Sequence, residues 1–489
     1  MRLDELTHMD IEDTAMAAVN ISGLSADSRN VQPGFLFAAL AGVEADGRSF
    51  IGQAIENGAA AILTDEPMVA GVPVVTSDNP RRDLALMAAR FFEMQPAHIA
   101  AITGTNGKTS TAVFLRQLFA AGGHKAASMG TLGLDIEGDS DGLDAAIDHT
   151  TPEPVRLHAA MRDLVAHQVT HLAMEASSHG LAQYRLDGVA LSLAGFTNLS
   201  RDHLDYHATA DDYAAAKQRL FTDVLVEDGM AVITMTHETG EKMAAACASA
   251  GRRVMPVGRE GDAVHMQITA RRATGIDVRV TLDGVGHDLQ LPLIGDFQTE
   301  NLTLALGMAR AGGVDGTSLL AACRNLQVPR GRMQLAGRTA EGAPIFVDYA
   351  HTPDALENAL TALRAHLADK GRLLVMFGCG GDRDSGKRAQ MGAVAAAHAD
   401  MVFVTDDNPR REDAAEIRAA IIGACPDAVE IGDRGSAIEA ALEAARADDL
   451  VLLAGKGHES GQIIGDIILP FDDVSMAQSV LASKGGQHA

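Results

Sequence analysis

Cysteine is scarce in this chain, and the few cysteines present are far apart. Of the 489 residues only Cys247, Cys323, Cys379 and Cys425 are cysteines, and no two of them form a CxxC pair. This spacing gives no support to a structural zinc site or to a disulfide framework. It is typical of reduced thiols in the cytosol.

Long apolar runs and an excess of positive charge are also missing. The chain begins MRLDELTHMDIED, which is acidic and lacks the apolar segment of an export signal. No apolar run reaches membrane-spanning length. Lys and Arg number 40 against 65 Asp and Glu, and the net charge of -25 argues against a nucleic-acid or anionic-membrane partner. We therefore expect a cytoplasmic protein that acts on small molecules as a monomer, with no nucleic-acid partner and no membrane insertion.

What the chain does contain is an alternation of strand-like and helix-like segments, which predicts α/β domains with largely parallel sheets. Its length exceeds what a single core supports. We predict a small α/β domain at 1–93, a central domain with a largely parallel sheet at 94–329, and a doubly wound, Rossmann-like domain at 330–489. Pro329 and Gly331 interrupt the pattern and mark the second boundary.

The stretch AITGTNGKTS at 101–110 ends like a phosphate-binding P-loop, although the usual first glycine is replaced by Ile102. A buried strand is predicted before it and a helix after it, from 110 to 121, so the order of elements is that of a P-loop. Backbone N–H groups would face a triphosphate, Lys108 would reach its outer phosphates and Thr109 could bind Mg²⁺. The ATP-binding residues expected here are Gly104, Thr105, Asn106, Gly107, Lys108, Thr109 and Ser110. The alternative is a Gly-Asn turn with a solvated lysine.

Three further residues fit a metal-assisted reaction. Glu175 stands at the end of a strand-like run, where a carboxylate suits a metal that bridges ATP and an acceptor. His203 lies in FTNLSRDHLDYH, and a lone histidine there is open to a structural reading. Lys217 lies on or beside the buried stripe of a helix that contains Tyr213 and Leu220, an unusual place for an unpaired ammonium. The alternative for Lys217 is a lysine that extends from a half-buried helix to solvent.

Taken together, these motifs resemble those of the Mur ligase superfamily, which joins amino acids to carboxylates with ATP. The similar stretches are TGTNGKT, MEASSHG, FTNLSRDHLDYH, GDFQTEN, the Gly-Arg pair at 331–332 and VDYAHTP, and they follow the family order along almost the whole chain. The resemblance implies that Asn301 lies near adenine, Arg332 near phosphate and Asp348 near ribose. It also implies two Mg²⁺ ions and a CO₂-derived carbamate on Lys217 (an N6-carboxylysine). The implied catalytic residues are Lys108, Glu175, His203 and Lys217, and the implied metal ligands are Thr109, Glu175, His203 and the Lys217 carbamate.

Other stretches resemble the uridine-nucleotide and muramyl-peptide contacts of the same family. LSADSR at 24–29, GVEADGR at 42–48, DHTTP at 148–152 and QYR at 183–185 carry this resemblance. It implies that Arg185 and the two threonines bind acidic and hydroxyl groups of a UDP-muramyl dipeptide. The residues implied for this substrate are Leu24, Ser28, Val43, Glu44, Ala45, Thr150, Thr151, Ser177, Gln183 and Arg185.

Three loops of the last domain, GCGGDR, DNPR and AGKGHE, each follow a predicted strand, so we expect them to meet at the carboxyl edge of one sheet. DNPR is the form found in family members that add meso-diaminopimelate, whose second carboxylate an arginine pairs bidentately. The string DNPRR also occurs at 78–82, where we predict a helix start. The residues implied for diaminopimelate are Arg383, Asp407, Asn408, Pro409, Arg410, Gly455 and Glu459.

The resemblance thus implies an ADP-producing ligase of peptidoglycan precursor synthesis. It would join meso-2,6-diaminopimelate to the D-Glu side-chain carboxylate of UDP-N-acetylmuramoyl-L-Ala-D-Glu through an acyl phosphate. A lysine-adding muropeptide ligase and a folylpolyglutamate synthase-like ligase are alternatives within the superfamily. A P-loop protein that uses nucleotide as a switch is an alternative from another class, and it would need no metal pair.

Overall fold

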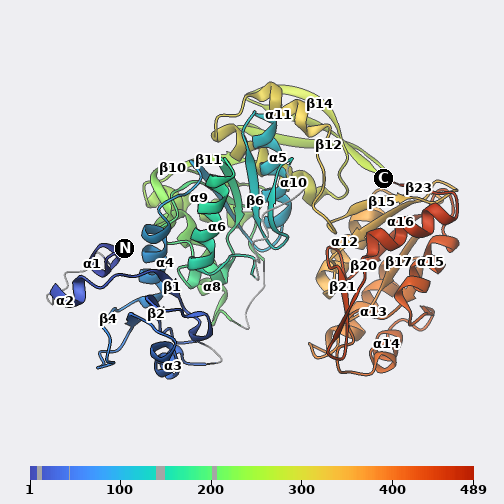
Figure 1. The fold of residues 1–489 in the computed structure, drawn as a ribbon. Helices are drawn as coiled ribbons and strands as arrows, with labels where there is room; N and C mark the ends of the chain where they lie inside the picture. Colours follow the sequence, from blue (N-terminus) through green and yellow to red (C-terminus); the bar gives the residue numbers. More distant parts are fainter. Residues whose placement is uncertain (8–13, 43–44, 139–148, 201–205, 489) are drawn as a thin grey trace. The chain divides into compact units, whose positions relative to one another are not determined.

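The computed structural model describes residues 1–7, 14–42, 45–138, 149–200 and 206–488. They form two compact units, one of residues 1–263 with 304–319 and one of residues 264–303 with 320–489. The elements of each unit are described separately below, and all are drawn in Figure 1.

The first unit begins with a small parallel sheet of four strands in the order β1-β2-β3-β4. Its strands are β1 (Gly23–Ser25), β2 (Phe35–Ala38), β3 (Ala61–Thr64) and β4 (Val74–Thr76). The helices around it are α1 (Leu3–Thr7), α2 (Thr14–Ala17), α3 (Ile51–Glu56) and α4 (Pro80–Phe92), with 3₁₀ turns at Ser28–Asn30 and Gly47–Phe50. Asn79 caps α4 by accepting a hydrogen bond from the Arg82 N–H, and Pro80 occupies the first turn. The DNPRR copy at 78–82 is therefore a helix start, as predicted.

The same unit contains a seven-stranded sheet in the order β11-β10-β9-β5-β8-β6-β7, parallel except for the edge strand β7. Its strands are β5 (His98–Thr103), β6 (Ala126–Gly130), β7 (Gly133–Ile136), β8 (His171–Glu175), β9 (Leu191–Phe196), β10 (Leu225–Thr234) and β11 (Arg253–Val257). The helices are α5 (Lys108–Ala121), α6 (Pro154–Ala166), α7 (Ser178–Ala182), α8 (Ala210–Arg219) and α9 (Glu238–Ser249), with a π turn at Leu220–Val224. Two further helices, α10 (Asp296–Ala311) and α11 (Gly316–Cys323), are each divided between the two units. The central strands are buried along nearly their whole length, as a parallel sheet covered on both faces requires.

The second unit contains a twisted antiparallel sheet and a second seven-stranded sheet. The antiparallel sheet has the order β12 (Val264–Arg272), β13 (Gly275–Leu282) and β14 (Val285–Leu291). The larger sheet has the order β19-β18-β17-β20-β16-β15-β23 and is parallel from β19 to β16. Its strands are β15 (Gln334–Arg338), β16 (Pro344–Asp348), β17 (Leu373–Phe377), β18 (Met401–Val404), β19 (Val429–Glu430), β20 (Leu450–Ala454) and β23 (Gln487–His488).

Helices cover both faces of this larger sheet (Figure 1). One core joins strand residues to α12 (Pro353–Arg364), α13 (Lys387–His398) and α14 (Ala414–Ile422), and the other joins them to α15 (Arg434–Ala444) and α16 (Asp473–Ser483). Several helices begin at a side-chain cap, for example Thr352 before α12 and Asp433 before α15. A separate hairpin of β21 (Gly461–Ile464) and β22 (Ile467–Pro470) follows the sheet. The arrangement is doubly wound, as predicted.

The predicted fold class, α/β with mostly parallel sheets, is confirmed. The four C-terminal strands expected from PIFVDY, LLVMFG, MVFVT and DLVLLAG are β16, β17, β18 and β20. The sheet β12–β14 belongs to the second compact unit, although the sequence places it within the predicted central domain. The domain limits at 93 and 329 stay a prediction.

Candidate active site

The loop between β5 and α5 is closed tightly on itself. Its Gly104 has a φ of +152°, and a Cβ there would overlap Oγ1 of Thr197. Gly107, at the start of α5, has a φ of +87°, in the left-handed region that favours glycine. Nζ of Lys108 donates to the carbonyl oxygens of Gly104 and Thr105, both at 2.9 Å. Both glycines are therefore required by the backbone, and the lysine lies back over the loop.

Residues after β9 hold this loop in place. The Thr105 N–H donates to the Asn198 carbonyl at 2.9 Å, and the Asn106 N–H donates to Asn198 Oδ1 at 3.0 Å. Thr197 Oγ1 donates to the Asn106 carbonyl at 2.6 Å. The N–H groups of the first turn of α5 have no acceptor within the helix, so they and the helix dipole form an anion-binding end. The loop has the backbone of a phosphate site.

Glu175 ends β8 beside this loop and is 2% exposed. Its Oε1 accepts hydrogen bonds from Thr109 Oγ1 at 3.0 Å and from the Thr131 N–H at 2.8 Å. A Cβ on Gly130 would overlap this carboxylate, so the strand packs directly against it. The carboxylate and hydroxyl oxygens of Glu175 and Thr109 are the kind of ligand that Mg²⁺ prefers, so the residues present fit that ion. His203, predicted to complete the set, lies outside the described residues.

Lys217 is buried on α8, with 1% of the residue exposed, as its place in the helical stripe predicts. Its Nζ donates to the Gly104 carbonyl at 2.7 Å and lies 4.3 Å from the centre of the Tyr213 ring. The Tyr213 hydroxyl in turn lies 3.1 Å from Oγ1 of Thr105. The side chain therefore extends to the phosphate-binding loop and not to solvent. Carbamylation of Lys217 stays a prediction.

Among described residues no group of three or more histidine, cysteine, aspartate or glutamate side chains is arranged to hold a metal ion by itself. A metal at Glu175 would thus need ligands from the nucleotide, from the substrate or from the predicted residues His203 and carbamylated Lys217.

The residues predicted to bind the muramyl dipeptide form one polar group at the end of β8. Thr151 Oγ1 donates to the Glu175 carbonyl at 3.0 Å and to Ser177 Oγ at 3.1 Å. Arg185 donates through Nη1 to the Thr151 carbonyl at 2.7 Å and through Nη2 to Gln183 Oε1 at 2.8 Å. Burial lowers the pKa of the Arg185 guanidinium. The structure therefore brings four of the predicted residues together.

Thr150 joins this group, because its Oγ1 lies 3.1 Å from Oγ1 of Thr131, which also contacts Glu175. Arg185 already pairs with Glu153 at 2.6 Å, so an acidic substrate group would compete with that carboxylate.

The predicted uridine-nucleotide residues lie around the small N-terminal sheet. Leu24 is in its hydrophobic core, 5% exposed, so its side chain packs inside the domain. Ser28 Oγ donates to Gln53 Oε1 at 2.7 Å, and the Ala45 carbonyl accepts from the Gly42 N–H at 3.0 Å. Val43 and Glu44 lie outside the described residues.

The second unit contains further residues predicted to bind adenosine and phosphate, and each of these side chains has a defined contact with a neighbouring residue. Asp348 Oδ2 accepts from the Met333 N–H at 2.7 Å and Oδ1 from the Ala350 N–H at 2.9 Å, and burial raises the pKa of this carboxyl. The Arg332 guanidinium lies 4.9 Å from the centre of the Tyr349 ring. On α10, Asn301 Nδ2 donates to Gln298 Oε1 at 3.1 Å.

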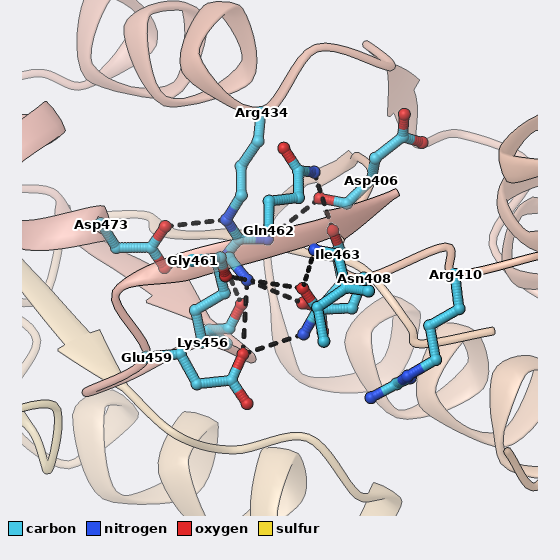
Figure 2. Close-up of polar contacts among 12 residues, drawn as sticks. Asp406, Asn408, Arg410, Arg434, Lys456, Glu459, Gly461, Gln462, Ile463 and Asp473 are labelled. Carbon is cyan, nitrogen blue, oxygen red and sulfur yellow. Dashed lines mark hydrogen bonds and ion pairs between the residues drawn. The ribbon is translucent and has the colours of Figure 1, made fainter. Parts of the chain in front are cut away.

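The C-terminal loops meet at the carboxyl ends of β18 and β20, as predicted (Figure 2). Asn408 Nδ2 donates to Glu459 Oε2 at 2.9 Å, which links the DNPR and AGKGHE loops. Gly455 has a φ of +110°, and a Cβ there would lie 3.4 Å from Asp407 Oδ2. Arg410 Nη1 donates to the Gly381 carbonyl at 2.8 Å, which adds the GCGGDR loop.

The backbone at Arg410 is unusual for this residue type. Its φ is +51°, and its N–H donates to the Ile463 carbonyl at 3.0 Å while its carbonyl accepts from the Gly465 N–H at 2.7 Å. The hairpin β21–β22 therefore holds this residue, with Pro409 immediately before it. Arg383 is exposed, and no hydrogen bond ties its side chain to the other residues of the site in the described chain.

Two residues of this cluster were missed in the sequence analysis. Lys456 is buried and contacts both Asn408 and Glu459, and Gln462 Nε2 donates to the Asp407 carbonyl at 2.7 Å. The only signal for Lys456 was its place between two glycines directly after a buried strand. Gln462 belongs to a hairpin whose position depends on contacts that are distant in sequence.

Family comparisons agree with this arrangement. Three family models match the chain. The model of the Mur ligase family, catalytic domain, matches residues 20–93, that of the Mur ligase middle domain matches 102–309, and that of the Mur ligase, glutamate ligase domain, matches 331–457. A protein of Bradyrhizobium diazoefficiens named UDP-N-acetylmuramoyl-L-alanyl-D-glutamate--2,6-diaminopimelate ligase is 48% identical over 99% of this chain and 100% of its own. The chain belongs to the Mur ligase family. Relatives of the same name in Agrobacterium fabrum and Caulobacter vibrioides are 47% and 49% identical, over 96% and 95% of this chain and 95% and 96% of theirs.

Solved structures of Mur ligases have the same fold. A structure of a UDP-N-acetylmuramoyl-L-alanyl-D-glutamate--2,6-diaminopimelate ligase superposes with a TM-score of 0.74 at 33% identity and covers 99% of both chains. The structure of MurF ligase from Thermotoga maritima in complex with ADP has a TM-score of 0.61 at 16% identity, covering 94% of this chain and 97% of that one. At that identity the second likeness shows the fold alone. In the described part of the chain no helix is long and apolar enough to cross a membrane.

Proposed function

We propose that this Mur ligase catalyses the ATP-dependent addition of meso-2,6-diaminopimelate to the D-Glu side-chain carboxylate of UDP-N-acetylmuramoyl-L-Ala-D-Glu. The observation that carries the proposal is the near full-length similarity, at 46–49% identity, to relatives named as diaminopimelate ligases. The products would be the muramyl tripeptide, ADP and phosphate, in peptidoglycan precursor synthesis.

Arg410 and its neighbours support diaminopimelate over lysine as the incoming amino acid. Diaminopimelate differs from lysine by a second carboxylate, which a guanidinium pairs through two parallel hydrogen bonds. Within the described chain, Nη1 of Arg410 donates to the Gly381 carbonyl, which leaves the rest of the fork for a carboxylate. Asn408 and Glu459 stand beside it with an amide and an acid that suit the ammonium and carboxylate groups of an amino acid.

The phosphate-binding loop supports ATP as the second substrate. The first turn of α5 supplies N–H donors, and Lys108 supplies a cation whose Nζ contacts the Gly104 and Thr105 carbonyls of the loop. Mg²⁺, when bound, would neutralise phosphate charge and draw the acceptor carboxylate to the nucleotide. Glu175 and Thr109 would hold that ion, together with His203 and a carbamylated Lys217.

The chain's own residues then have separable tasks. Thr151, Gln183 and Arg185 would orient the acceptor peptide at the end of β8, next to Glu175. Asp348 would bind the ribose, and Arg332 a phosphate. The amine of diaminopimelate attacks the acyl phosphate, so no covalent bond to the protein is needed, and positioning with charge stabilisation supplies the catalysis.

The proposal extends to where the enzyme works. All four cysteines are unpaired and buried, which supports a reducing compartment such as the cytoplasm. The protein would act as a monomer whose partners are small molecules.

Incorporation of radioactive amino acid into UDP-N-acetylmuramoyl-L-Ala-D-Glu tests the proposal. We expect incorporation of meso-diaminopimelate, with lysine incorporated poorly, and ADP formation that requires both the muramyl substrate and the amino acid. Preferred use of lysine would replace this proposal by the lysine-adding ligase. ADP formation that is independent of both substrates would indicate a nucleotide switch.

A further inference from the structure

Lys456 is the most buried cation of the C-terminal loop cluster, with a side chain 0% exposed. Its Nζ lies within 3.5 Å of four acceptor oxygens: the Gly461 carbonyl at 2.7 Å, Asn408 Oδ1 at 3.0 Å, Glu459 Oε2 at 3.3 Å and Asp407 Oδ1 at 3.5 Å. These acceptors come from the loop after β18, the loop after β20 and the start of β21. One ammonium therefore ties together three of the segments around the predicted amino-acid site (Figure 2).

The contacts of Lys456 determine which way the Asn408 amide faces. Both Lys456 Nζ and the Ile463 N–H, each 3.0 Å from one end of this amide, can only donate, so that end must be the oxygen Oδ1. The other end, Nδ2, then donates to Glu459 Oε2 at 2.9 Å. Without the ammonium, one of the two donors that orient the amide is lost.

The same ammonium offsets part of the negative charge of its carboxylate neighbours. Asp407 and Glu459 contribute two carboxylates, and Lys456 is the cation in contact with both. Glu459 Oε2 accepts from Asn408 and from Lys456, whereas Oε1 accepts no hydrogen bond from the described residues. Lys456, Asp407 and Glu459 together keep one negative charge in excess, and Glu459 keeps one carboxylate oxygen open, which suits a substrate ammonium.

A second buried pair supports the cluster from behind. Arg434 and Asp473, both with fully buried side chains, pair at 2.6 Å. Arg434 also donates through Nη2 to the Ala454 carbonyl at 2.9 Å and through Nη1 to the Asp406 carbonyl at 3.4 Å. The strand ends from which the two loops start are thereby fixed, so Lys456 acts between rigid supports.

We propose that Lys456 is a positioning residue for the incoming amino acid: it holds the Asn408 amide and the Glu459 carboxylate in the geometry that binds the amino-acid ammonium, without contacting the substrate. The inference rests on the proposed function and adds a residue to it.

Steady-state kinetics of Lys456→Met in the full-length enzyme test the inference, with each of the three substrates varied in turn. Methionine keeps the length and removes the charge. Because a charge-assisted network then loses its donor, we expect the KM for diaminopimelate to rise by roughly 10- to 100-fold. The KM values for ATP and for the muramyl dipeptide should change by less than about twofold, and kcat at saturating diaminopimelate should change little. A KM for diaminopimelate equal to that of the wild type would overturn the inference.

A double-mutant cycle with Glu459→Gln separates positioning from general loss of structure. If Lys456 acts through Glu459, Lys456→Met in the Glu459→Gln background should raise the KM for diaminopimelate by less than about threefold. Full additivity of the two changes would mean that Lys456 does not act through Glu459 and would overturn the inference. A parallel rise in all three KM values would do the same, because it indicates a structural role.

Matched variants complete the experiment. Lys484 pairs with Glu439 and Glu443 at the surface of the same unit, so Lys484→Met should leave all three KM values unchanged. If Lys456→Met does not fold, Lys456→Arg replaces it: the fork cannot reach all four oxygens, and an unchanged KM for diaminopimelate would refute the inference. A wild-type enzyme that adds no diaminopimelate would overturn the proposed function instead, which keeps the two failures distinct.

Discussion

Arg410 combines a left-handed backbone with a guanidinium that approaches a loop carbonyl, and its neighbours hold both in place. A positive φ costs an arginine on the order of 1 kcal/mol, which the hydrogen bonds to Ile463 and Gly465 offset. This backbone directs the Arg410 guanidinium into the predicted site. We therefore expect Arg410→Ala to raise the KM for diaminopimelate by the factor that corresponds to a loss of roughly 2 kcal/mol of binding free energy or more. Steady-state kinetics with diaminopimelate as the varied substrate measure this.

Arg81 in the first DNPRR copy is the matched control. It starts α4 and donates to the Ala41 carbonyl within the N-terminal part of the first unit. Arg81→Ala should therefore leave the KM for diaminopimelate almost unchanged. Equal effects of the two substitutions, or a larger effect at Arg81, would contradict the assignment of the amino-acid site.

Lys217 is the residue at which a chemical modification is proposed. Its Nζ is buried against the Gly104 carbonyl and the Tyr213 ring, beside the loop where Mg²⁺ would lie. If a carbamate on this nitrogen holds a metal, Lys217→Ala should nearly abolish ligation, and added bicarbonate should restore nothing in the variant. The rate of tripeptide formation with and without bicarbonate measures this. A variant that keeps most of its activity would disprove the carbamate.

At the scale of elements, the sequence predicts the segments whose structure depends on neighbouring residues, and also the sheet edge at which parallel strands end. The unit β5, loop and α5 follows from an apolar run, two glycines and a helix stop at Gly122, all within about two dozen residues. The burial of Lys217 follows from helical spacing in the same way. The convergence of the three C-terminal loops was predictable because parallel strands end at one edge of a sheet.

The hairpin β21–β22 shows the limit of that reasoning. Ile467 and Ile468 are 64% and 69% exposed, so its apolar residues follow no pattern of burial that a sequence reveals. Its place beside Arg410 depends on backbone hydrogen bonds between segments about fifty residues apart. The role of Lys456 depends on the same hairpin through the Gly461 carbonyl. Such side-chain networks become visible only when the loops are in place.

At the scale of the whole molecule, buried imidazoles link stability to pH. Burial lowers the pKa of His158, His171 and His458 to about 4, against an ordinary value of 6.5. In the unfolded chain these histidines bind a proton as the pH falls below 6.5, whereas in the folded chain they stay neutral until about pH 4. The unfolded state binds more protons throughout this window, so the free energy of unfolding must decrease as the pH falls through it.

His158 offers the sharpest test of this linkage, because it is completely buried on α6, with 0% of the residue exposed. With a folded pKa of about 4 and an unfolded pKa of 6.5, this one group should lower the free energy of unfolding by about 2 kcal/mol between about pH 7.5 and about pH 5. His158→Phe removes the titration, so the difference in unfolding free energy between the two pH values should shrink by about that amount. Urea unfolding followed by circular dichroism, at both pH values and for both proteins, measures it. The absolute stability of the variant does not matter, since only the pH-dependent part is compared. An equal pH dependence in the two proteins would show that the pKa of His158 is the same in the folded and the unfolded chain, and would contradict the shift expected from its burial.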